Sequence, residues 1–71
     1  MEQPKAPLLL DEREVAEMLG VDVAIVRRWR LSRQGPRFIQ LGRSVRRYRV
    51  TDVLAWIESR LDGGEPLEAA R

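Results

Sequence analysis

Apolar positions recur with a helical period through the first half of the chain. They fall three or four residues apart from residue 12 to 19, and again from 23 to 31. Asp11 and Glu14 have the spacing of a capping box, with Asp in place of the usual Ser or Thr, and mark the start of the first helix. Gly20 is suited to the left-handed conformation that ends a helix. Two helices separated by a turn of three residues are therefore expected.

Each of these two helices is expected to have one apolar face. Asp22 precedes the second helix and can accept hydrogen bonds from its first amide groups. Glu12 and Glu17 are expected to point outward from the first helix, and Arg27 and Arg28 from the second. The expected buried residues are Val15, Ala16, Leu19, Val26 and Trp29, with Leu9 or Leu10 covering the first helix and Ile25 flanking the second. Such a pair of helices is a helix-turn-helix.

The period changes from helical to β-strand after Gly35-Pro36, a dipeptide that marks a loop. The runs Phe38 to Leu41 and Val45 to Val50 are β-prone and flank Gly42 to Ser44, which predicts a hairpin with its tip at these three residues. The residues expected on its inner face are Ile39 or Phe38, Leu41, Val45 and Tyr48. The arginines of the hairpin are expected to project outward.

A third helix is expected after the hairpin. Thr51 is placed to cap this helix and Gly63-Gly64 to end it. Its predicted buried stripe contains Val53, Trp56, Ile57 and Leu61. The order helix, turn, helix, hairpin, helix predicts an α+β, mostly helical fold, a winged helix-turn-helix over residues 8–62. Residues 1–7 are expected to be a flexible N-terminal arm, and residues 63–71 a C-terminal tail.

Charge is unevenly distributed along the chain. Its 71 residues carry 13 basic and 11 acidic side chains, for a net charge of +2. No acidic residue occurs between Asp22 and Asp52, whereas nine arginines do: Arg27, Arg28, Arg30, Arg33, Arg37, Arg43, Arg46, Arg47 and Arg49. Charge of one sign on one part of a small fold is typical of a surface that binds a polyanion. Arginine suits phosphate groups and guanine edges, although a GC-rich coding bias is an alternative reason for its excess over lysine.

Composition argues against several other classes of protein. Without Cys or His the chain has no disulfide and none of the usual zinc-site spacings, so we expect no metal and no cofactor. Tyr48 lies among arginines, as a DNA-cutting tyrosine nucleophile would, but no general acid–base groups accompany it. Tyr48, Trp29 and Trp56 are therefore expected to be packing residues. No apolar run approaches the roughly 18 residues that span a membrane. We expect a soluble, cytoplasmic protein that is not an enzyme and has no small-molecule substrate.

The second helix carries the first group of candidate binding residues. In a helix-turn-helix the second helix enters the major groove with its N-terminal residues nearest to the base edges. The residues at these positions are Val23, Ala24, Arg27 and Arg28, and Arg30 is a candidate for a contact with the DNA backbone. Either Arg27 or Arg28 can hold a guanine through two hydrogen bonds. The alternative is a solvated amphipathic helix whose arginines bind nothing.

The hairpin carries the second group, which consists of Arg43, Ser44, Arg46 and Arg47. A tip that contains glycine can approach a phosphate closely, and a narrow minor groove attracts arginine. Alternatively, the charged side chains protect the edge of the sheet against association with other sheets. Which of Arg46, Arg47 and Arg49 faces DNA is left open by the sequence.

Four segments together resemble the excisionase and AlpA-type small DNA-binding proteins, which are relatives of the MerR-type winged helix. These segments are 9–21, 26–30, 41–46 and 52–57. The resemblance implies a recombination directionality factor of a phage or mobile element. Such a factor binds and bends double-stranded DNA at the arms of an attachment site and steers an integrase toward excision. The matching positions are Val23, Ala24, Arg27 and Arg28 on the recognition helix, and Arg43, Ser44 and Arg46 on the wing.

Two features depart from the family pattern. Asp22 stands where Ser or Thr is usual, and the stretch from Val45 to Asp52 is about one residue longer than is common.

The long dimerising helix of MerR-type regulators is not expected, since the chain ends within ten residues of Leu61. Weak self-association of copies bound side by side is expected instead. The alternative functions are an AlpA-type transcriptional regulator and a protein-binding adaptor with a basic face.

Overall fold

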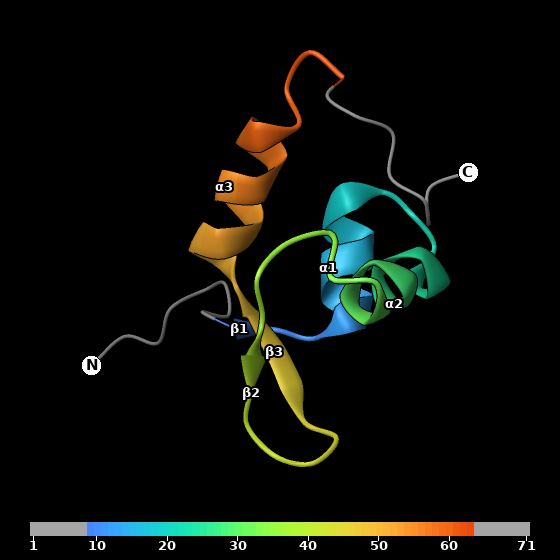
Figure 1. The fold of residues 1–71 in the computed structure, drawn as a ribbon, viewed down its shortest axis with the longest axis vertical. Coiled ribbons are helices and arrows are strands. Elements are labelled where there is room, and N and C mark those ends of the chain that lie inside the picture. The colour runs from blue at the N-terminus through green and yellow to red at the C-terminus, as the bar shows by residue number, and fades with distance from the viewer. Residues whose placement is uncertain (1–8, 64–71) are drawn as a thin grey trace.

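Three helices surround a small antiparallel sheet in the computed structural model, which describes residues 9–63 (Figure 1). In chain order the elements are β1 (Leu9–Leu10), α1 (Glu12–Leu19), α2 (Val23–Leu31), β2 (Ile39–Gln40), β3 (Arg46–Arg49) and α3 (Val50–Ser59). Helices α1 and α2 lie together on one side of the sheet, and the β2–β3 hairpin projects away from α3. The predicted winged helix-turn-helix is confirmed. The predicted arm, residues 1–7, and all but the first residue of the predicted tail, residues 63–71, lie outside the described residues.

Side-chain and glycine caps set the limits of α1 and α2. The Asp11 carboxylate accepts a hydrogen bond from the Glu14 N–H at 2.8 Å, and the Glu14 carboxylate accepts one from the Asp11 N–H at 2.9 Å. Gly20 ends α1 with a φ of 72°. Asp22 then caps α2 by accepting from the Ala24 N–H at 2.9 Å. The capping box, the glycine stop and the three-residue turn are thus all confirmed.

The core lies where the three helices meet β3. Its fully buried side chains are Val15, Val26, Tyr48 and Val53, joined by Leu10, Ala16 and Trp29. Partly buried residues that pack against this core include Leu19, Ile25, Trp56 and Ile57. The ring centroids of Trp29 and Trp56 are 5.0 Å apart. The predicted packing roles of Tyr48 and the two tryptophans are therefore confirmed.

The loop between α2 and β2 closes one end of the core by lying against Trp29. Gly35 has a φ of 86°, and a Cβ atom there would lie 2.9 Å from the Cβ of Trp29, so a larger residue does not fit without a shift. The Gln34 N–H donates a hydrogen bond to the Trp29 carbonyl at 2.7 Å, and Pro36 is buried. The loop predicted from Gly35-Pro36 is confirmed.

Strand β3 is the central strand of the sheet, whose order is β1-β3-β2. Leu10 of β1 pairs with Tyr48, and Ile39 of β2 pairs with Arg47. Sequence analysis does not predict β1, because two residues are too few to show a β period. Its Leu10 is 7% exposed and belongs to the same buried cluster as Val15 of α1, so the covering role expected for Leu9 or Leu10 falls to Leu10.

Two residues expected on the inner face of the hairpin are exposed instead. Leu41 is 57% exposed and Val45 is 42% exposed, whereas Tyr48 is 1% exposed. The prediction for Leu41 and Val45 was wrong because the strands are shorter than expected: β2 ends at Gln40 and β3 begins at Arg46, so both residues lie in the loop between them, away from the core. Phe38 does contact Tyr48, with ring centroids 5.9 Å apart.

Helix α3 begins earlier and ends earlier than predicted. Its N-cap is Arg49, not Thr51, because β3 continues directly into the helix. Its last residue is Ser59, and Leu61 beyond it is 68% exposed, so neither the Thr51 cap nor the burial of Leu61 is correct. Val53 is fully buried, as predicted. Within residues 9–63, no helix has the length and apolar character needed to cross a membrane.

Candidate nucleic-acid interface

Helix α2 presents a polar face at its N-terminal half. Ala24, Arg27 and Arg28 are exposed along this face, as predicted. Val23 is only half-buried, because part of its side chain packs against the core. Val26 and Trp29 are buried on the opposite side of α2, and their packing holds the exposed face in position.

The wing, which we define as β2, β3 and the loop 41–45 between them, ends in a tight turn. The Val45 N–H donates to the Gly42 carbonyl at 3.4 Å, which leaves Arg43 and Ser44 exposed at the tip. The Gln40 side chain braces this turn by donating to the carbonyls of Gly42 at 2.5 Å and of Arg43 at 3.3 Å. The predicted tip is confirmed, whereas the role of Gln40 is visible only in the structure.

An open cleft of about 190 Å³ lies between the start of α2 and the wing. The residues that line this cleft are Asp11, Glu12, Arg13, Val23, Arg27, Ser44, Arg46 and Arg47. Both wing arginines are half-buried, and Nη1 of Arg47 donates to the Arg46 carbonyl at 2.7 Å. Two groups of predicted residues that are about twenty positions apart in the chain therefore face one cleft. Arg28 and Arg43 lie outside its lining.

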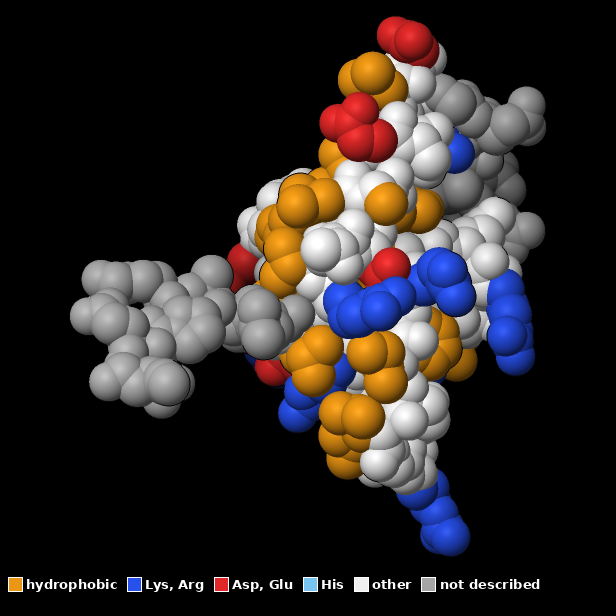
Figure 2. Space-filling model, turned by 90° about the vertical axis from the view of Figure 1, so that its left-hand side faces the viewer, with side chains coloured by type: hydrophobic (Ala, Val, Ile, Leu, Met, Phe, Trp, Pro, Cys, Tyr) orange, Lys and Arg blue, Asp and Glu red, His pale blue; other side chains and the backbone are white. Residues whose placement is uncertain are grey.

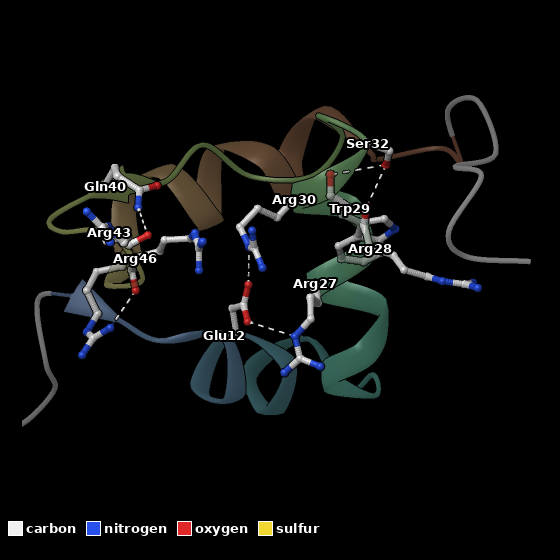
Figure 3. A network of polar contacts seen from close by, with 10 residues as sticks. Glu12, Arg27, Arg28, Trp29, Arg30, Ser32, Gln40, Arg43 and Arg46 are labelled. Atoms are coloured by element: carbon white, nitrogen blue, oxygen red, sulfur yellow. Dashed lines mark hydrogen bonds and ion pairs between the residues drawn. The ribbon is translucent and has the colours of Figure 1, made fainter.

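Glu12 projects toward α2 and not outward, which corrects the prediction (Figure 3). Its carboxylate lies between Arg27 and Arg30, and its side chain is 17% exposed. Arg30 is 11% exposed and donates from Nε to Glu12 Oε2 at 2.5 Å, so it links α2 to α1. Burial raises the pKa of Tyr48, and the neighbouring Glu12 carboxylate raises this pKa further, so the phenol stays neutral near pH 7.

Arg49 is engaged by Asp52 at the start of α3. Its Nε donates to Oδ2 of Asp52 at 2.6 Å, and its Nη2 donates to Oδ1 at 3.1 Å. This hydrogen bonding, together with the charges of Arg49 and Arg37, lowers the pKa of Asp52 below its usual value. Of the three wing arginines left open by the sequence, Arg46 and Arg47 line the cleft and Arg49 does not.

The arrangement of α1, α2, the wing and α3 is that of a winged helix-turn-helix protein. A family model described as a helix-turn-helix domain matches residues 9–61, and the chain belongs to this family. No curated protein and no solved structure matches the chain. Membership of the family supports DNA binding, with double-stranded DNA as the partner.

Proposed function

We propose that the chain reads double-stranded DNA with the N-terminal half of α2 and holds the DNA backbone or minor groove with the wing. The observation that supports this mode is the single cleft shared by Val23 and Arg27 of α2 and by Ser44, Arg46 and Arg47 of the wing. A recognition helix in the major groove and a wing beside it contact adjacent parts of one duplex. The proposed contact residues are Val23, Ala24, Arg27, Arg28, Arg43, Ser44, Arg46 and Arg47.

We propose further that the protein is an excisionase, acting in the bacterial cytoplasm on the attachment-site arms of a phage or mobile element. Support comes from the resemblance of four segments of the chain to excisionase and AlpA-type proteins. In this role several copies bind side by side, bend the DNA and favour the excisive direction of an integrase. Bending a site of 20–30 base pairs costs about 1–6 kcal/mol, which neighbouring copies share.

Exposed apolar side chains are the observation behind the proposed weak association between copies. Leu41 and Val45 are exposed in the loop of the wing, and Figure 2 shows apolar side chains gathered over α3 and the hairpin, with basic side chains among them. Exposed apolar surface of this kind favours contacts with another protein. In this proposal the neighbouring copy, or the integrase, provides that contact.

An excision assay tests the directionality role. Purified integrase from the parent element is incubated with a substrate that carries both recombined attachment sites, with and without the protein. We expect more excised product when the protein is present, and no increase in integration. Unchanged excision despite sequence-specific binding would refute the directionality role and favour the AlpA-type regulator, which uses the same DNA-binding surface.

A further inference from the structure

Leu31 is the most exposed of the large apolar side chains within residues 9–63, at 69%. It belongs to the last turn of α2, and it is neither part of the core nor one of the partly buried residues packed against the core. A single exposed leucine needs no explanation by itself. Leu31 is informative because of its position, which is on the face of α2 proposed to enter the major groove.

Leu31 lies between the two arginines of that face. Successive residues of an α-helix are rotated by about 100°, so Leu31 is about 40° from Arg27 and about 60° from Arg28, between the two. The Arg27 side chain is 50% exposed, Arg28 is exposed as well, and the two project from α2 in different directions (Figure 3). The buried residues Val26 and Trp29 lie on the opposite side of the helix. Leu31 is therefore near the middle of the exposed face.

The last turn of α2 can stay close to the bases because the helix is short. Its nine residues span only about 13.5 Å, which is close to the roughly 12 Å width of the major groove. Leu31 is four positions beyond Arg27, or about 6 Å along the helix axis, and this distance corresponds to about two base-pair steps of 3.4 Å. When α2 lies along the groove, Leu31 therefore meets a base pair about two steps from the one that Arg27 contacts.

The arginines beside Leu31 favour a base edge over a protein surface as its partner. A helix that docks into an apolar groove of another protein presents apolar side chains at positions i, i+3, i+4 and i+7. On this face of α2 these positions are Ala24, Arg27, Arg28 and Leu31, so both central positions are charged. In the major groove, an apolar group and hydrogen-bond acceptors do occur side by side, as the C5-methyl of thymine and the O6 and N7 atoms of guanine.

We infer that Leu31 is a specificity-determining residue, which contacts the C5-methyl group of a thymine in the major groove. This inference rests on the proposed reading of DNA by α2 and extends it to the last turn of the helix. Thymine is the only base that carries an apolar group on its major-groove edge. Contact with this methyl removes apolar surface of both partners from water, so binding favours thymine over the other bases at this position.

Replacement of thymine by deoxyuridine tests this contact. Deoxyuridine lacks the C5-methyl group and keeps the hydrogen-bonding groups of thymine. A duplex is first selected from a random pool with the wild-type protein, and each thymine of the selected site is then replaced in turn. Dissociation constants are measured for the wild-type protein, for L31A and for the control L61A. Leu61 is 68% exposed, follows α3 and is not one of the proposed contact residues, so L61A removes a similarly exposed leucine elsewhere.

We expect deoxyuridine at one position to weaken binding of the wild-type protein about three- to fivefold, which is the effect of losing one buried methyl group. L31A should bind the thymine duplex more weakly by at least a similar factor, and deoxyuridine at that position should then have no further effect. L61A should behave as the wild-type protein does. L31M keeps a large apolar side chain and should retain most of the sensitivity to deoxyuridine.

Two results would overturn the inference. One is equal sensitivity of the wild-type protein and L31A to deoxyuridine at every position, and the other is a selected site that contains no thymine. A wild-type protein that enriches no sequence would refute base reading by α2 together with this inference. Failure of the excision assay alone would leave the inference standing, because that assay tests the directionality role and not the contact.

A measurement on the wild-type protein makes the result independent of substitutions. The leucine methyl groups are labelled with carbon-13, and nuclear Overhauser effects to thymine methyl protons are recorded in the complex with the selected duplex. We expect such an effect between Leu31 and the thymine identified by deoxyuridine, and none from Leu61. A complex in which Leu31 shows no effect to any thymine methyl would contradict the inference.

Discussion

Among single residues, Trp29 contributes most visibly to holding separate parts of the fold together. It belongs to the buried cluster, its ring lies 5.0 Å from that of Trp56 on α3, and the loop at Gly35 packs against its Cβ. A domain of this size has only one small core, so one large side chain supplies a considerable share of its stability.

We therefore expect Trp29→Ala to lower the free energy of unfolding by about 3–5 kcal/mol, because it leaves a cavity between α2, α3 and the loop. Urea denaturation followed by far-ultraviolet circular dichroism measures this loss. Leu31→Ala is the control on the same helix, since Leu31 is 69% exposed, and it should change stability by less than about 0.5 kcal/mol. Equal effects of the two substitutions would show that the buried face of α2 is wrongly assigned.

Glu12 and Gln40 show what the sequence does not reveal at this scale. Glu12 precedes its partner Arg30 by 18 positions, and nothing in the local pattern indicates that the two side chains meet. Gln40 contacts backbone carbonyls that come together only when the wing turns. The sequence does contain one indication of a partner for Glu12. Arg27 and Arg30 lie three positions apart on one face of α2 and carry the opposite charge.

At the scale of elements, the helices were more predictable than the strands. Capping residues, glycine and helical spacing are local signals, and they placed α1 and α2 correctly from Asp11 to Leu31. The sheet depends on pairing between distant segments, which local signals do not encode. For that reason β1 was missed, the inner face of the wing was partly wrong, and the start of α3 was misplaced at Thr51.

The helix and the wing are expected to contribute differently to binding. The two duplexes compared are one selected from a random pool with the wild-type protein and a scrambled one of the same composition. Arg27→Ala should weaken binding to the selected duplex by about 1–3 kcal/mol, because a base contact is lost. It should weaken binding to the scrambled duplex by less than about 0.5 kcal/mol. Arg43→Ala should weaken binding to both duplexes about equally, because a phosphate or groove contact is lost. Fluorescence anisotropy measures both. Equal losses on the two duplexes for Arg27→Ala would refute its role as a reader.

For the molecule as a whole, the nine arginines of the acid-free segment form separate groups. Arg27 and Arg28 are exposed on α2, and the wing carries three more of the proposed contact arginines. Arg30 and Arg49 are held by Glu12 and Asp52. The number of arginines in the sequence therefore overstates the charge that the folded protein offers to a duplex.

This reduced number sets the expected salt dependence. Four or five phosphate contacts predict a log–log slope between about −3.5 and −4.5 for binding to a random duplex, whereas nine contacts predict about −8. Titrations from 50 to 300 mM NaCl measure this slope. A slope near −8 would mean that all nine arginines contact phosphates, which requires Arg30 and Arg49 to exchange their carboxylate partners for DNA. A failure to bind duplex at low salt would instead favour the protein-binding adaptor.

Strand β1 ties the start of the described chain to a strand near its end. Leu9 pairs with Arg49, forty positions further along the chain, and Leu10 completes the core beside Tyr48. Contacts between such distant positions form late, because the intervening chain must first be ordered. On the ribosome, α1 and α2 emerge well before the strand that covers them. The nascent chain should therefore gain its stable fold, and with it the shared cleft, only when synthesis of the domain is almost complete.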